Sequence, residues 1–172
     1  VTSPVLQSIN LANLPSLEKI NVASDTALHV LNTSGCPALK AIMGYASGIE
    51  SVDLSKNTKL EQVTLSGTKV KKYDFSNNPE LNNIFIGSES LESVVFKNNT
   101  KVSSLMISCL KNVKQKPDFS NFPELTNLSL DYYPWESFAI PTSKKLNSLS
   151  FQSSEFLKEI DVHENVKLRS FT

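Results

Sequence analysis

An apolar pattern of the form LxxLxL, where L stands for any apolar residue, recurs along the whole chain every ten to twelve residues. Two successive copies make one repeat of 21 or 22 residues, a spacing typical of solenoids built from stacked coils. One coil cannot bury its own apolar face, so each repeat has to pack against its neighbours. The first halves of the repeats begin at residues 6, 28, 49, 70, 91, 113, 135 and 157, and the second halves begin at 17, 39, 60, 81, 102, 125, 146 and 168.

Within the halves, the fourth and sixth positions are typically apolar, as in Val52 and Leu54 of one half and Val63 and Leu65 of the next. Alternation with a period of two residues predicts a short β-strand in each half. Ser, Thr, Asn and Gly fill the intervals, and no half has room for a helix of ordinary length. We therefore expect a β-rich solenoid of about eight coils with parallel strands and little or no α-helix, forming a single domain over residues 1–172.

The bend that ends each first half carries its own signature. Its ninth position is Asn in Asn57, Asn78, Asn99 and Asn165, and its tenth is Pro in Pro15, Pro37, Pro79 and Pro123. Stacked side-chain amides can bond the backbone groups that turn inward there, and proline fixes φ at the bend. Cys36 and Phe122 replace Asn, and Lys116-Pro117 lengthens the repeat that begins at Val113, so we expect irregular packing at these places.

The segments IESVDLSKNTKL (residues 49–60) and LKEIDVHENVKL (residues 157–168) are close to the pattern LxxLDLSxNxxL. The alternation of such halves with LxxLxLSxxx halves resembles the short leucine-rich repeats common in surface proteins of Bacteroidetes and related bacteria, over essentially the whole chain. The resemblance implies a leucine-rich-repeat fold and a secreted or surface-anchored protein that binds host or environmental macromolecules. It does not imply a particular ligand.

The charge balance argues against two classes of partner. The chain has 17 basic and 17 acidic residues, so it lacks the positive surface that neutralises nucleic-acid phosphates or anionic lipids. No segment approaches the roughly 18 apolar residues of a membrane span. We expect no nucleic-acid partner and no membrane insertion.

The reactive side chains are too scattered for catalysis. His29 and His163 lie six coils apart, which at a strand spacing of about 4.8 Å separates them by roughly 29 Å. The sequence contains no GxSxG, HExxH, CxxC or glycine-rich phosphate loop. We therefore expect a protein that is not an enzyme, with no catalytic residues and no cofactor.

Cysteines and aspartates are the remaining candidates for chemistry. Cys36 and Cys109 are three coils apart, about 14 Å, which is too far for a disulfide. We expect Cys36 to be a buried structural thiol. Acidic residues form a column at the fifth position of first halves; they are Asp53, Asp74, Asp118 and Asp161. Neighbouring carboxylates in this column could hold a cation. Lysines beside them and interruptions of the column favour a solvated surface without a metal.

The outward positions of the second halves form the candidate binding face. From Asn82 onward this face loses almost all charge, and amide and hydroxyl side chains surround two apolar residues, Phe85 and Met106. Such a mixture is typical of protein recognition surfaces. The residues we expect to bind a ligand are Asn82, Asn83, Phe85, Ser104, Met106, Asn127, Ser129 and Tyr132. An ordinary solvated sheet remains the alternative.

The segment Asp131-Tyr132-Tyr133-Pro134-Trp135 concentrates aromatic residues, which commonly anchor sugars or protein partners. Trp135 falls at a repeat start equivalent to Val70, so its register favours packing in the core. Tyr132 is the aromatic residue of this segment that we expect to be exposed.

Two functions fit these observations. The first is a non-enzymatic, extracellular or cell-surface scaffold for binding or adhesion that presents a parallel sheet to a protein or glycan ligand. The second is a structural spacer or assembly domain of a larger surface protein. We expect the export signal or anchor to lie outside these 172 residues, the chain to be part of a longer protein, and its terminal strand edges to be capable of association between copies.

Overall fold

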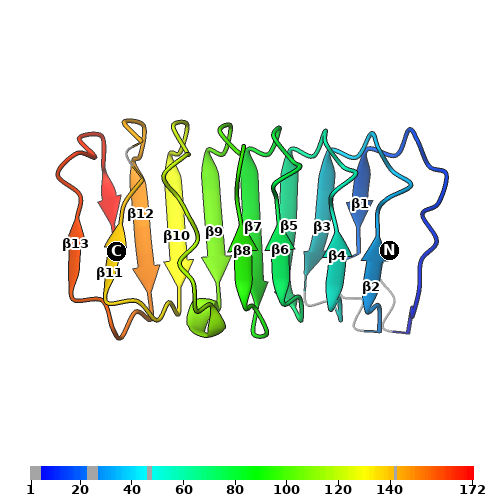
Figure 1. Ribbon diagram of the computed structural model, residues 1–172, viewed down its shortest axis with the longest axis horizontal. Helices are drawn as coiled ribbons and strands as arrows, with labels where there is room; N and C mark the ends of the chain where they lie inside the picture. The colour runs from blue at the N-terminus through cyan, green and yellow to red at the C-terminus, as the bar shows by residue number, and fades with distance from the viewer. Residues whose placement is uncertain (1–4, 23–26, 46–47, 142) are drawn as a thin grey trace.

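The computed structural model describes residues 5–22, 27–45, 48–141 and 143–172, and the chain winds through them as a β-solenoid (Figure 1). One short 3-10 helix, η1 (Leu110–Asn112), is the only helix in these ranges. The strands are β1 (Lys19–Asn21), β2 (Val30–Asn32), β3 (Ala41–Tyr45), β4 (Ser51–Asp53), β5 (Gln62–Thr68), β6 (Lys72–Asp74), β7 (Asn83–Ser88), β8 (Ser93–Val95), β9 (Ser104–Ser108), β10 (Asn127–Asp131), β11 (Ser137–Ala139), β12 (Ser148–Gln152), β13 (Glu159–Asp161) and β14 (Ser170–Phe171). The expected β-rich architecture is confirmed.

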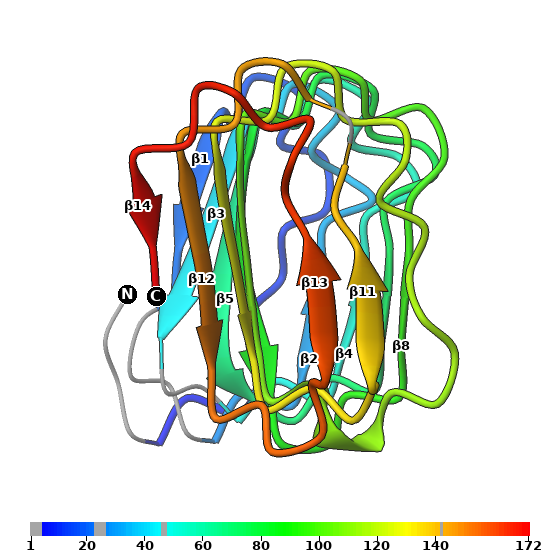
Figure 2. The same cartoon turned by 90° about the vertical axis from the view of Figure 1, so that its left-hand side faces the viewer.

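The second halves of the repeats form one parallel sheet of eight strands in the order β1-β3-β5-β7-β9-β10-β12-β14. Its register follows the repeat: Ile42 pairs with Val63, and Ile84 with Leu105, in each case 21 residues on. The step from Leu105 to Leu128 is 23 residues, because the chain between them contains the lengthened repeat. Viewed along the solenoid, this large sheet forms one wall and the first-half strands form the other (Figure 2).

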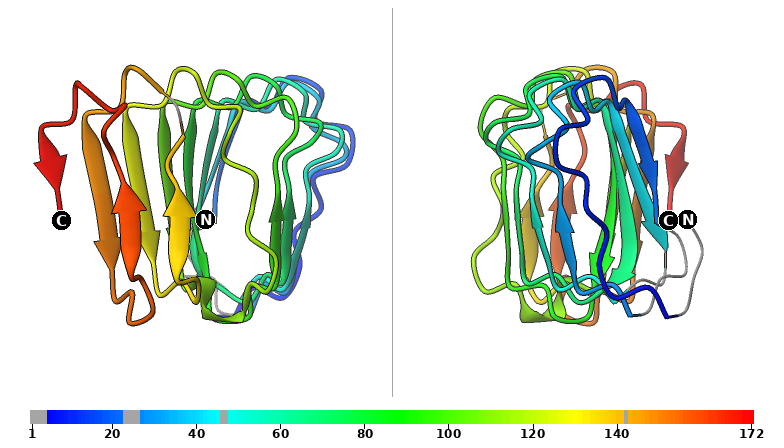
Figure 3. Two further views of the ribbon diagram at one scale, coloured as in Figure 1. Left: turned by 60° about the vertical axis from the view of Figure 1, so that its left-hand side comes forward. Right: turned by 90° about the vertical axis from the view of Figure 1, so that its right-hand side faces the viewer.

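The first halves deviate from the expectation of one strand in every half. Their strands have three residues each and pair only two by two, as β2 with β4, β6 with β8, and β11 with β13. Within the described residues, no strand forms in the first half that begins at Val113, where Pro117 has no N–H to donate to a ladder. The prediction of irregular packing at Lys116-Pro117 is confirmed. Two further views show the continuous large sheet facing the interrupted layer of first-half strands (Figure 3).

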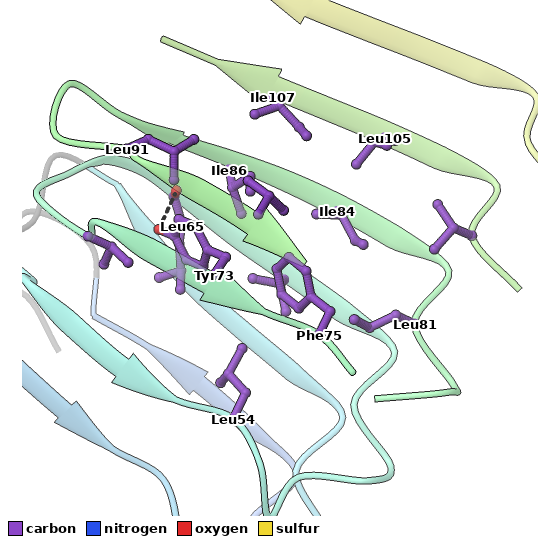
Figure 4. Packing of buried hydrophobic residues seen from close by; sticks show 14 of the residues in the cluster. Leu54, Leu65, Tyr73, Phe75, Leu81, Ile84, Ile86, Leu91, Leu105 and Ile107 are labelled. Carbon is purple, nitrogen blue, oxygen red and sulfur yellow. Dashed lines mark hydrogen bonds between the residues drawn. The ribbon is translucent and has the colours of Figure 1, made fainter. Parts of the chain in front are cut away.

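Apolar side chains from both walls fill the interior. Leu65, Ile84 and Ile86 of the large sheet meet Tyr73 of β6 and Phe75, which follows that strand, and all five are buried (Figure 4). The Tyr73 hydroxyl is bonded to Thr68 Oγ1 at 3.0 Å, which satisfies the polar end of a buried ring. Burial raises the pKa of Tyr73 far above its ordinary value, so the ring stays neutral.

The asparagines of the first halves form a ladder along the interior of the bend. Asn78 Nδ2 donates to Leu54 O at 3.0 Å and to Asn57 O at 2.9 Å, and Asn99 Nδ2 repeats the arrangement one coil later. Cys36 occupies the same position, and its Sγ lies 3.5 Å from Leu11 O. The prediction that Cys36 is a buried thiol in this position is confirmed.

Aromatic rings fill the interior at the coil where Phe122 replaces the ladder asparagine. Phe122, which stands in place of Asn, packs edge-on against Phe96 with ring centroids 5.1 Å apart. Phe119 and Phe138 continue the cluster at 5.3 Å, and Tyr133 lies 5.9 Å from Trp135. Trp135 is buried in the core, as its register predicts.

Candidate functional site

The large sheet carries most of the predicted ligand-binding residues in two parallel rows. Strand pairing places Asn83, Ser104 and Asn127 side by side in the first row. It places Phe85, Met106 and Ser129 side by side in the second row, two residues further along each strand. Because alternate residues of a strand share a face, these six side chains form one outward surface, which we call the sheet face.

Two predicted residues lie outside these rows. Asn82 precedes β7, and its carbonyl oxygen accepts the backbone N–H of Ser103 and the Ser103 hydroxyl at 2.9 and 3.1 Å. Its backbone therefore holds neighbouring coils together. Tyr132 follows the end of β10 in a turn, where it is 50% exposed. The expected exposure of Tyr132 is confirmed, but its position separates it from the two rows.

The structure adds a residue to the sheet face that the sequence pattern missed. Tyr45 lies at the end of β3, is 45% exposed, and contacts Phe85 edge-on with ring centroids 6.5 Å apart. Phe85 is directly paired with Met106, which is 41% exposed. Tyr45, Phe85 and Met106 thus form an exposed apolar patch across four strands. Tyr45 lies two residues after Met43 and therefore on the same face of the strand. The LxxLxL pattern ends before Tyr45, so the pattern alone does not identify it.

Charged side chains elsewhere bind one another between neighbouring coils. Lys40 Nζ lies 2.7 Å from Glu18 Oε1 at the N-terminal end of the large sheet, and Lys71 Nζ lies 3.2 Å from Glu92 Oε1 on the other wall. Lys158 and Glu136 form a similar pair at 2.9 Å. The two rows of the sheet face have no charged side chain from Asn83 to Ser150, so a partner can cover them without desolvating an ion.

The aspartates on the first halves close local turns. Asp53 Oδ1 accepts the Ser55 N–H at 2.9 Å, and Asp74 Oδ1 accepts the Ser76 N–H at 3.1 Å. Hydrogen bonds from the backbone and side chain of Ser55 to Asp53, and from the side chain and backbone of Ser76 to Asp74, hold the pKa of both carboxyl groups below the ordinary value. Lys72 Nζ lies 3.2 Å from Asp74 Oδ2, so this lysine neutralises the Asp74 carboxylate as expected. In the described part of the chain, no three His, Cys, Asp or Glu residues form a group that could hold a metal ion.

The cysteines and histidines occupy unrelated sites. Cys36 and Cys109 are both free thiols, and burial raises the pKa of each. His29 Nδ1 lies 3.1 Å from Glu50. His163 contacts Asp161 and Glu164, and the neighbouring carboxylates raise its pKa. None of these contacts joins a histidine to a cysteine.

Comparison with known proteins extends the description of the fold. No protein-family model and no curated protein sequence matches the chain. Among solved structures, the chain is similar to the functional domain of InlJ from Listeria monocytogenes, described as including a cysteine ladder, with a TM-score of 0.51 and 16% identity. The similarity covers 95% of this chain and 45% of that one.

The similarity concerns the fold alone and agrees with a repeat solenoid of parallel strands. In the present chain, asparagine supplies most rungs of the internal ladder, and Cys36 is a cysteine rung. Among the described residues, no helix has both the length and the apolar character needed to span a membrane.

Proposed function

We propose that this chain is a non-enzymatic binding scaffold of an extracellular or cell-surface protein, of the type that carries short leucine-rich repeats in Bacteroidetes. The observation that carries the proposal is the sheet face, where an exposed apolar patch is surrounded by uncharged amides and hydroxyls. Of the two ligand classes expected from the sequence, protein and glycan, the patch favours a protein, because aromatic residues and Met are enriched where proteins meet.

The rigidity of the sheet supports this function. In the large sheet, backbone hydrogen bonds hold every strand except the two edge strands on both sides, so the strand positions that carry Phe85, Met106 and Asn127 are fixed before a ligand arrives. A surface that is already ordered loses less conformational entropy on binding. Cofactors and metals have no part in the proposal.

A spacer or assembly domain is the second candidate. The strands β1 and β14 each pair on one side only, and Phe171 of β14 is exposed. Two copies could therefore pair through these edges. Sedimentation velocity at rising protein concentration tests this candidate, because edge pairing predicts growing assemblies and a pure binding scaffold does not.

The decisive experiment is a protein and glycan binding array with two variants that each add two lysines. One variant carries Phe85→Ala, Met106→Lys and Asn127→Lys on the sheet face, and the control carries Ser51→Lys and Ala139→Lys on exposed positions of the short strands. Circular dichroism first establishes that both are folded. We expect the sheet-face variant alone to lose the ligand that the natural chain binds. Equal binding by all three proteins, or no ligand for any, would move the assignment to the spacer.

A further inference from the structure

The backbone is left-handed at one repeat position at or near the end of a strand of the large sheet in several coils. The φ angle is 67° at Gly67, 65° at Cys109, 52° at Tyr132 and 54° at Ser153, and each residue is the eighth of its second half. Glycine enters this region freely, whereas a residue with a Cβ loses roughly 1–2 kcal/mol. Tyr132 therefore holds a bulky ring at a position that suits glycine, and strain of this kind points to a use for the ring.

The ring of Tyr132 borders a surface pocket of about 160 Å³ near the ends of β9, β10 and β12. Phe156, which is 55% exposed, and Pro134 contribute its other apolar walls. Among the described rings, Tyr132 and Phe156 do not contact each other, so neither covers the other. A cavity of about 150 Å³ accepts one benzene molecule, so this pocket has room for a single six-membered ring.

Polar groups with unused bonding capacity line the same pocket. Within the described residues, Lys111 and Glu155 form no ion pair, although Lys40, Lys71 and Lys158 each bind a glutamate of a neighbouring coil.

We propose that this pocket binds one pyranose ring of a glycan. The carbon-bound hydrogens on one face of the sugar pack against Tyr132 and Phe156, while its hydroxyl groups bond to Lys111 and Glu155. A proline or phenyl side chain would match the walls but would displace water from Lys111 and Glu155 without offering them a hydrogen-bond partner, which costs binding free energy. The site lies outside the two rows of the sheet face and does not depend on the function proposed for them.

The test is ligand-observed NMR of the natural chain with methyl glycosides of glucose, galactose, mannose and N-acetylglucosamine, followed by titration of those that bind. Tyr132→Gly and Phe156→Ala should each weaken binding about tenfold or more, because each removes one aromatic wall. Tyr132→Gly should leave the thermal midpoint unchanged or higher, since glycine relieves the left-handed turn. A purely structural tyrosine would instead lower the midpoint.

Two controls separate this site from the sheet face. Tyr45→Ala removes an exposed ring from the sheet face, and Phe171→Ala removes a ring as exposed as Phe156, so both should bind the glycosides normally. The proposal is overturned if no glycoside binds the natural chain, or if N-acetylprolinamide or N-acetylphenylalaninamide binds in place of the glycosides. Binding that is lost in Tyr45→Ala and kept in Tyr132→Gly would overturn it as well, while leaving the sheet face in place as a binding surface.

Discussion

At the scale of single residues, the asparagines of the ladder determine how tightly one coil holds the next. Asn99 Nδ2 donates to Phe75 O at 3.0 Å and to Asn78 O at 2.8 Å, so one side chain satisfies two buried carbonyl groups. Its own Oδ1 accepts the Lys97 N–H at 3.1 Å. Both polar atoms of the Asn99 side chain are thus hydrogen-bonded inside the protein, which explains why asparagine recurs at the bend.

Replacement of Asn99 by Ala should therefore lower the free energy of unfolding by about 2–4 kcal/mol, since each buried polar group left without a partner costs about 1–3 kcal/mol. Urea denaturation followed by circular dichroism measures the change. The neighbouring Asn98 is exposed, and Asn98→Ala is the matched control with little expected effect. Equal stability of the two variants would show that the Asn99 hydrogen bonds do not stabilise the protein.

The turn aspartates predict how stability depends on pH. Hydrogen bonds from Ser55, Ser76 and Ser120 lower the folded-state pKa of Asp53, Asp74 and Asp118 below the unfolded value of about 3.9. Their stabilising contribution is thus complete above the unfolded pKa and is lost as pH falls through the folded pKa.

Asparagine can close the same turn without titrating, as Asn32 does by accepting the Ser34 N–H at 3.0 Å. The test compares the natural chain with a triple variant that carries Asp53→Asn, Asp74→Asn and Asp118→Asn. In thermal unfolding between about pH 5 and pH 2, the triple variant should lose less stability on acidification than the natural chain. Identical pH profiles would show that these turns do not depend on the charge.

At the scale of elements, the coil that begins at Val113 replaces a strand and a ladder rung by packed aromatic rings. Phe122 lies 5.1 Å from Phe96 and 6.2 Å from Phe119, measured between ring centroids. Restoring the repeat pattern with Phe122→Asn should therefore destabilise the protein by about 3 kcal/mol or more, because a cavity opens among the rings.

The repeat pattern by itself predicts the opposite, since a return to consensus commonly stabilises a repeat. Differential scanning calorimetry of Phe122→Asn decides between the two, with Gln115→Ala, an exposed change in the same coil, as the control. A higher midpoint for Phe122→Asn would mean that the ladder matters more than the aromatic cluster.

At the scale of the whole molecule, stability should decrease toward the ends of the solenoid. Strands β5, β7 and β9 have a partner on each side, whereas β14 has one. Leu157, Ile160 and Leu168 of the last coil are only partly buried, while Leu81, Ile84 and Leu91 are fully buried. Nearest-neighbour contacts dominate the stability of repeat proteins, so end coils open first.

Native-state hydrogen exchange measures this gradient directly. We expect the amides of β7 and β9 to exchange most slowly and those of β14 to exchange fastest among the strands of the large sheet. Uniform protection from β1 to β14 would show that the solenoid unfolds as one cooperative unit.

The sequence by itself determined the coil length, the parallel strands and the positions of the ladder, because every coil repeats the same local pattern. Alternation of apolar residues selected the inner face, and the bend required a side chain such as Asn57 that could bond the carbonyl groups of the preceding coil. The same periodicity identified six of the eight predicted ligand-binding residues as members of two outward rows.

Tertiary structure alone decided the features that depend on a departure from the repeat. The exposed patch includes Tyr45 because β3 continues past the apolar pattern and brings its ring to Phe85, two strands away. Tyr132 belongs to a pocket beside Phe156 because the chain turns left-handed after β10. Contacts between coils place these rings, and a repeat pattern specifies only what each coil shares with its neighbours.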